Sequence, residues 1–117
     1  MRESSTAAAQ EALLGQAAAA AGAGVLVHDD TLRYVAANSA ACKLLGYTRD
    51  QLLALRVHDL VERPGGGLVD TAREVLGGKI RHGTASIRRK DGMSFPAQYV
   101  SAPAQIDGLP YVVTLLW

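Results

Sequence analysis

Two Asp-Gly pairs divide the last third of this 117-residue sequence into three strand-like runs. The runs are IRHGTASIRR, SFPAQYVSAPAQI and LPYVVTLLW, and the pairs between them are Asp91-Gly92 and Asp107-Gly108. Asp-Gly between two such runs is a strong signal for a tight hairpin turn. Strands joined by hairpins run antiparallel. The sequence therefore predicts three consecutive antiparallel strands at its C-terminal end.

A third hairpin is predicted near the start, where GVLVHDD and TLRYVAAN are joined by a short polar link. Together the runs give a five-stranded antiparallel sheet. The first and last runs are apolar at successive positions instead of alternating, so both faces of the sheet centre need cover. Helices cover one face, and the N-terminal helix or a second subunit is expected to cover the other.

Capping signals mark short helices between the two groups of strands. Asn38 or Ser39 can cap a helix over residues 39 to 45, which Gly46 ends in the left-handed conformation. The Thr-x-x-Gln pattern that begins at Thr48 is a capping box for a second short helix. The stretch VHDLVE predicts a third piece of a single turn, and RPGGG breaks the chain after it.

Two longer helices complete the prediction. GLVDTAREVLGG, from Gly67, places its apolar residues at helical spacing. The Ala-rich start, from about Ser5 to Ala21, also favours a helix, but one that is marginal unless it docks on another surface. The predicted fold class is α+β, with short helices on one face of the sheet. Residues 1–22 form an N-terminal flanking helix, and residues 23–117 form the folded domain.

Charge and cysteine content exclude several classes of protein. Twelve basic and eleven acidic residues give a net charge of +1, so no general field attracts nucleic acid or an anionic membrane. The basic cluster RRK is expected to be a solvated hairpin tip. A single cysteine forms no internal disulfide, and polar residues interrupt the apolar start, which argues against a signal peptide and a membrane span. The expected location is cytoplasmic.

Three stretches carry a resemblance to a known family: VAANSAACKLLGYTRDQLL, IRRKDGMSFPAQY and GLPYVVTLLW. Asn, small residues and Leu-Leu-Gly-Tyr-Thr follow two short strands, and the Arg-Lys-Asp-Gly hairpin stands at the right distance. From about Gly24 to Trp117 the sequence resembles a PAS domain. The resemblance implies a sensory or interaction module, often a homodimer, whose cavity holds a small ligand or is packed with side chains. It also implies an effector in cis or in trans, such as a histidine kinase, a phosphatase or a transcription regulator, so that the chain is either an excised or a stand-alone domain.

Cofactor chemistry is judged against the same family. Its light-sensing members carry the flavin-bonding cysteine on a later helix, and VHDLVERPGG, the corresponding stretch, has none. Cys42 is therefore expected to be a buried packing residue, and flavin–cysteinyl photochemistry is not expected. Haem is disfavoured, because the longer helix lacks the usual histidine and His28 and His82 read as surface residues. No set of residues has zinc spacing or the arrangement of a catalytic site, so no metal and no enzyme activity are expected, and the cofactor is left open.

Three hypotheses follow: a sensor and dimerisation module for a small apolar or amphipathic ligand, a ligand-free protein–protein interaction domain, and, third, an enzyme. If a cavity is present, we expect it to be lined by Leu45, Leu53, Val57, Val61, Val75, Ile87, Tyr99 and Val113. A slip of one residue would invert each strand's contribution. His58 either hydrogen-bonds a ligand or lies on a solvated helix edge. The expected dimer surface consists of Leu13, Leu14, Ala17 and Trp117.

Overall fold

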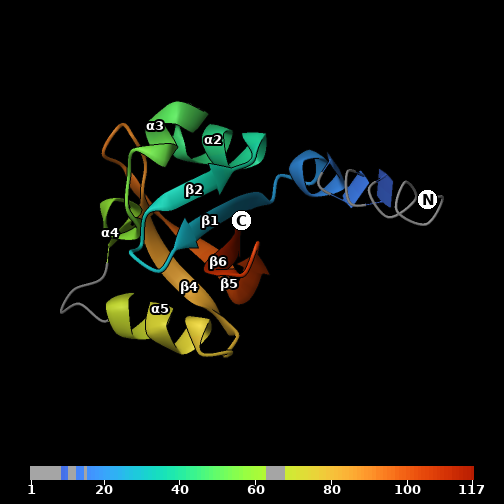
Figure 1. The fold of residues 1–117 in the computed structure, drawn as a ribbon. Coiled ribbons are helices and arrows are strands. Elements are labelled where there is room, and N and C mark those ends of the chain that lie inside the picture. Colours follow the sequence, from blue (N-terminus) through green and yellow to red (C-terminus); the bar gives the residue numbers. More distant parts are fainter. Residues whose placement is uncertain (1–8, 11–12, 15, 63–67) are drawn as a thin grey trace.

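The protein is a curled antiparallel sheet with helices along its concave side (Figure 1). This computed structural model describes residues 9–10, 13–14, 16–62 and 68–117. The six strands lie in the order β2-β1-β6-β5-β4-β3, and all neighbours are antiparallel. They are β1 Gly24–Asp29, β2 Tyr34–Ala37, β3 Val61–Glu62, β4 Arg81–Arg88, β5 Ser94–Ile106 and β6 Leu109–Leu116. The predicted α+β class and the predicted hairpins are confirmed.

The predicted number of five strands is wrong, because β3 adds a sixth. The third helical piece, α4, spans only Val57–Leu60. Val61 then adopts an extended conformation, with φ −93° and ψ 118°, and lies opposite Ile87 of β4. A β-branched residue suits this pleated position, so the chain leaves the helix one turn after entering it.

Local capping sets the bounds of the other short helices, as predicted. In α2, Ser39–Leu45, the Asn38 side chain accepts a hydrogen bond from the backbone N–H of Ala41, and Gly46 ends the helix at φ 83°. The capping box of α3, Arg49–Leu53, is formed by Thr48 and Gln51. These caps satisfy backbone N–H groups that an α-helix leaves without partners at its start.

Asn38 also joins α2 to the first strand. Its Oδ1 accepts from the backbone N–H of Val25 at 2.9 Å, and its Nδ2 donates to the carbonyl of Ala23 at 3.1 Å. One side chain therefore caps a helix and fixes the entry of β1 into the sheet.

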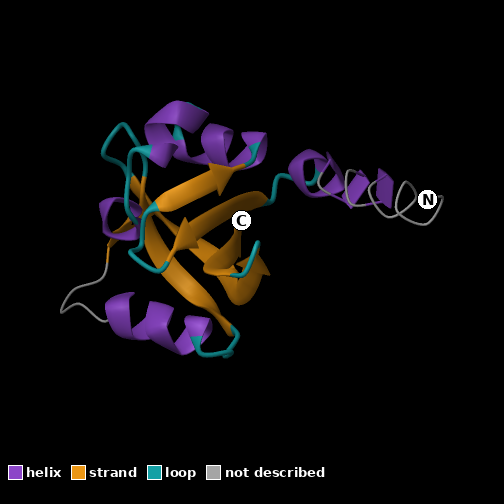
Figure 2. Cartoon of the chain, in the orientation of Figure 1, coloured by secondary structure: helices purple, strands orange, loops and turns teal. Residues whose placement is uncertain are grey.

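Helices cover the two ends of the concave face differently (Figure 2). The first two, α2 and α3, pack against β1 and β2, whereas α5, Leu68–Leu76, packs against β5 and β6. The predicted starts of this helix at Gly67 and of the Ala-rich helix at Ser5, together with the RPGGG break, lie outside the described residues. Leu45 and Leu52 are completely buried in the core between these layers.

The N-terminal helix does not cover the convex face of its own sheet. Its described residues, 9–10, 13–14 and 16–20, are helical and project away from the sheet (Figure 1). Leu13 and Leu14 are 65% and 70% exposed. The convex face was predicted to be covered either by the N-terminal helix or by a second subunit. The helix of the same chain does not cover it.

Candidate functional site

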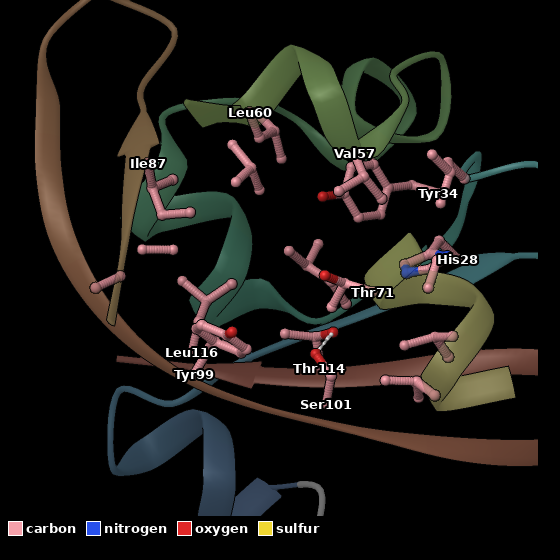
Figure 3. A pocket seen from close by; sticks show the side chains of 18 of the residues that line it. His28, Tyr34, Val57, Leu60, Thr71, Ile87, Tyr99, Ser101, Thr114 and Leu116 are labelled. Atoms are coloured by element: carbon pink, nitrogen blue, oxygen red, sulfur yellow. Dashed lines mark hydrogen bonds between the residues drawn. The ribbon is translucent and has the colours of Figure 1, made fainter. Parts of the chain in front are cut away.

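A cavity of about 90 Å³ lies between the concave face of the sheet and the helices α4 and α5 (Figure 3). Its wall is mostly aliphatic, with contributions from each of the six strands; the short β3 contributes Val61. Leu26 comes from β1, Ala97 from β5, and Val112 and Leu116 from β6. Because successive side chains of a strand point to opposite faces, each strand offers every second residue to this space.

Six of the predicted cavity residues meet around this space. They are Leu45, Val57, Val61, Val75, Ile87 and Tyr99. They come from α2, α4, β3, α5, β4 and β5, so elements far apart in the sequence build one site. Their contact with a ligand remains a prediction.

Three of the predicted residues do not line the cavity. Val113 lies opposite Val27 and Ala102 on the convex face, because its neighbours Val112 and Thr114 face inward. Leu53 is half-buried at the end of α3, where Leu52 takes the inward position.

His58 is exposed on α4 and does not line the cavity either. Val57 and Leu60 are the buried residues of this single turn, so the residue between them faces solvent. The structure therefore places His58 on the solvated helix edge.

The polar residues of the cavity were missed by sequence reasoning, with the exception of Tyr99. They are His28, Tyr34, Thr71, Ser101 and Thr114. The expectation that His28 is a surface residue is wrong, since its side chain is only 6% exposed. Alternation carried the signal, because His28 follows buried Leu26 by two positions and therefore shares its face.

His28 and Tyr34 lie together at one end of the cavity. Their rings meet edge to face, with centroids 6.2 Å apart and planes at 83°. The Nδ1 of His28 lies 2.8 Å from the carbonyl oxygen of Asp29. A carbonyl oxygen only accepts, so Nδ1 carries the proton and Nε2 of the neutral ring is left as an acceptor.

Burial keeps both of these side chains uncharged. Desolvation lowers the pKa of His28, against the opposing effects of the carbonyl and the carboxylate of Asp29, so the ring is neutral at pH 7. Burial also raises the pKa of the Tyr34 phenol, and the Asp59 carboxylate adds to this. Tyr34 therefore keeps its proton and is a hydrogen-bond donor.

A second polar position lies on the sheet itself. Ser101 and Thr114 are cross-strand partners, and their hydroxyl oxygens are 2.7 Å apart (Figure 3). One hydroxyl donates to the other, which leaves the pair one O–H for another acceptor. The neighbouring Tyr99 lies across Gly83, where an added Cβ would be 3.6 Å from the phenol oxygen.

No charged side chain lines the cavity among the described residues. Aspartate, glutamate, lysine and arginine are all missing from its wall. Within the same residues, no three potential metal ligands lie together. What the site offers is apolar contact with a few hydrogen-bonding groups.

The other residues singled out in the sequence lie elsewhere. Cys42 is partly buried on α2, where it packs against the core, and does not line the cavity. Trp117 is 51% exposed, Ala17 is exposed, and Leu13 and Leu14 project from the N-terminal helix. None of the helices in the described part of the chain combines the length and the apolar character needed to cross a bilayer.

The sequence model of the PAS domain family matches residues 22–116. The chain therefore belongs to the PAS domain family, as its resemblance predicted. Among curated proteins, none matches this chain.

Solved PAS domains share the fold across most of the chain. The PAS domain of the HTR-like protein from Haloarcula marismortui is 13% identical with a TM-score of 0.80, over 99% of this chain and 97% of that one. A domain of the sensory box sensor histidine kinase/response regulator from Geobacter sulfurreducens is 21% identical with a TM-score of 0.71, over 82% of both chains. A PAS domain from Desulfitobacterium hafniense is 22% identical with a TM-score of 0.71, over 80% and 90%.

Proposed function

We propose that this chain is the sensory module of a cytoplasmic signal-transduction protein. It binds a small molecule in the cavity between sheet and helices and relays binding to an effector without catalysing a reaction itself. The observation that carries the proposal is the cavity of about 90 Å³, whose apolar wall contains hydrogen-bonding side chains at two positions. Such a combination is typical of small-molecule sites, in which a few polar groups fix the orientation of the ligand.

The effector is proposed from the kinds of protein to which structurally similar domains belong. One similar structure belongs to a sensor histidine kinase/response regulator, and another is a PAS domain from a two-component sensor histidine kinase. A histidine kinase in cis or in trans is therefore the first effector to test, with a phosphatase or a transcription regulator behind it.

A homodimer is part of the proposal. The convex face of the sheet carries half-buried Val25, Val27 and Val113 and the more exposed Leu115. Leu13 and Leu14 are exposed on a helix that ends at Ala20, shortly before β1 starts at Gly24, and such an Ala-rich helix needs a surface to dock on. In a homodimer, the N-terminal helix of one copy would dock on the convex face of the other and cover it. Residues 1–22 would then act as the flanking dimer helix and residues 23–117 as the sensory domain.

A ligand-free interaction domain is the second candidate. The cavity is smaller than the roughly 300 Å³ at which sites for drug-sized ligands begin. A module that only relays partner contacts needs no ligand space, and the exposed apolar residues of the convex face would serve it equally well.

Native mass spectrometry of the protein as purified, without added ligand, separates these candidates. A dimer with a reproducible extra mass, lost on denaturation, supports the chemical sensor and identifies its ligand. A dimer of bare chains that small molecules also fail to stabilise supports the interaction domain. A bare monomer contradicts the helix-mediated dimer, and a double Leu13→Ser and Leu14→Ser variant provides the matched control for the dimer measurement.

A further inference from the structure

The cavity contains a hydrogen-bond donor that finds no acceptor among the described residues. Figure 3 shows the Tyr34 hydroxyl pointing into the open space, and in the described part of the chain it makes no hydrogen bond. The residue as a whole is only 4% exposed, so its hydroxyl faces the cavity and not the outer surface of the protein. Such a hydroxyl depends on cavity water or on a ligand for its hydrogen bond, and a ligand that accepts from it supplies that bond.

The adjacent ring supplies the opposite group. His28 uses its Nδ1–H on the carbonyl of Asp29, which leaves Nε2 as an acceptor. The two rings meet edge to face, so this acceptor lies in the wall beside Tyr34, whose hydroxyl is at the end of its ring remote from His28 (Figure 3). A hydroxyl group is the smallest ligand group that both accepts and donates a hydrogen bond.

Charge and size narrow the ligand further. The described wall has no aspartate, glutamate, lysine or arginine to pair with an ion, and the desolvation of an isolated charge is far costlier than that of a neutral polar group. An engineered cavity of about 150 Å³ takes up benzene, so about 90 Å³ suits a molecule of only a few heavy atoms. The rest of the wall is aliphatic and favours a hydrocarbon body.

We infer that the cavity selects a small uncharged alcohol, whose hydroxyl oxygen accepts from Tyr34 and whose hydrocarbon part packs against the aliphatic wall. This inference rests on the proposed function, because it names the class of ligand for the same site. Ser101 and Thr114 are a second polar position in the wall, where one hydroxyl donates to the other and one O–H is left.

Three probes of matched shape test the inference: isobutanol, isobutylammonium and isopentane. They differ only in the terminal OH, NH₃⁺ or CH₃ group. Dissociation constants are measured by protein-observed NMR, from the chemical-shift changes of the cavity residues. Isobutanol is expected to bind, and isobutylammonium at least 10-fold more weakly. This comparison uses the unaltered protein and needs no variant.

The variant Tyr34→Phe isolates the hydroxyl contact. It should weaken isobutanol about 3- to 10-fold, the usual range for one hydrogen bond, and leave isopentane within about twofold. Comparing the change for the two probes cancels their different hydrophobicity, as a double-mutant cycle does. Tyr111→Phe is the matched control. This substitution removes the same hydroxyl from a tyrosine of β6 that does not line the cavity.

The outcomes separate the two proposals. If Tyr34→Phe changes isobutanol and isopentane equally, or if isobutylammonium binds as tightly as isobutanol, the alcohol inference is overturned while ligand binding stands. If none of the probes shifts the cavity resonances, the proposed ligand cavity fails together with the inference drawn from it.

Discussion

Filling the cavity from the sheet side should stabilise the protein. Ala97 of β5 is 1% exposed, lines the cavity and lies opposite another wall residue, Ala85. The substitution Ala97→Val directs two further carbons into this space. At about 0.8 kcal/mol per buried methylene, the gain is about 1.6 kcal/mol. A cavity of about 90 Å³ costs on the order of 2 kcal/mol at 24 cal/mol per Å³, so the two estimates agree in size.

Urea unfolding and calorimetry measure this gain directly. For a domain of this size, about 1.6 kcal/mol corresponds to a rise in Tm of roughly 5 to 10 °C. Ala102→Val is the matched control, since it makes the same substitution in the same strand at a half-buried position outside the cavity wall. It carries the same change in strand propensity and should alter stability by no more than about 0.5 kcal/mol.

A loss of stability in Ala97→Val would refute the reasoning. Overpacking a filled core typically costs about 1 to 3 kcal/mol, so that result would mean that side chains already occupy the space in solution. It would also favour the ligand-free interaction domain. A gain in stability accompanied by loss of any co-purified mass would instead tie the ligand to this cavity.

Three further predictions concern single side chains. Burial lowers the pKa of His28, so below about pH 6.5 the histidine is protonated in the unfolded chain while it is still neutral in the folded chain. The free energy of unfolding should therefore fall as the pH drops below about 6.5, by at most about 1.4 kcal/mol per pH unit, which urea titrations measure. His28→Gln should flatten this slope and exposed His82→Gln should not, and equal slopes in both would contradict the assignment. Asn38→Ala removes three hydrogen bonds and should cost about 2 to 4 kcal/mol in the same assay, whereas a cost as small as that of Ser39→Ala would show that water replaces them. Gly46→Ala forces a side chain into φ 83°, where its Cβ would make only ordinary contact with Lys90, and should lower the unfolding free energy by about 1 to 2 kcal/mol. An unchanged Tm would argue against the left-handed helix end.

The parts of the fold that sequence predicts well are those fixed by local chemistry. Asn38 and Gly46 set the bounds of α2 through hydrogen bonds and backbone conformation within a few residues, and Thr48 does the same for α3. The sixth strand could not be read in this way. Val61 becomes part of the sheet only because Ile87, far along the chain, lies beside it.

The cavity wall was harder to predict for a different reason. In β6 the run Val112, Val113, Thr114 has no clear alternation, so nothing in its own sequence says which residues face inward. The register with β1 and β5 decides it, and this register depends on turns and packing outside the strand. For His28 the pattern was present but was outweighed by the general expectation that a single histidine near aspartates lies at the surface.

The size of the cavity would also limit how strongly the proposed sensor could respond to a ligand. A ligand of about five heavy atoms, at the ceiling of about −1.5 kcal/mol per atom, gains roughly −7.5 kcal/mol, which corresponds to a Kd of several micromolar at best. A ligand shifts a two-state equilibrium only by its difference in affinity for the two states. Any conformational response would therefore depend on this small binding free energy. The strand best placed to pass it from the cavity to the convex face is β1. Its Leu26 and His28 line the cavity, its Val25 and Val27 belong to the convex face, and its first residues follow directly from the projecting helix. A ligand that moves β1 slightly would act on both parts of the proposed dimer surface through one rigid element.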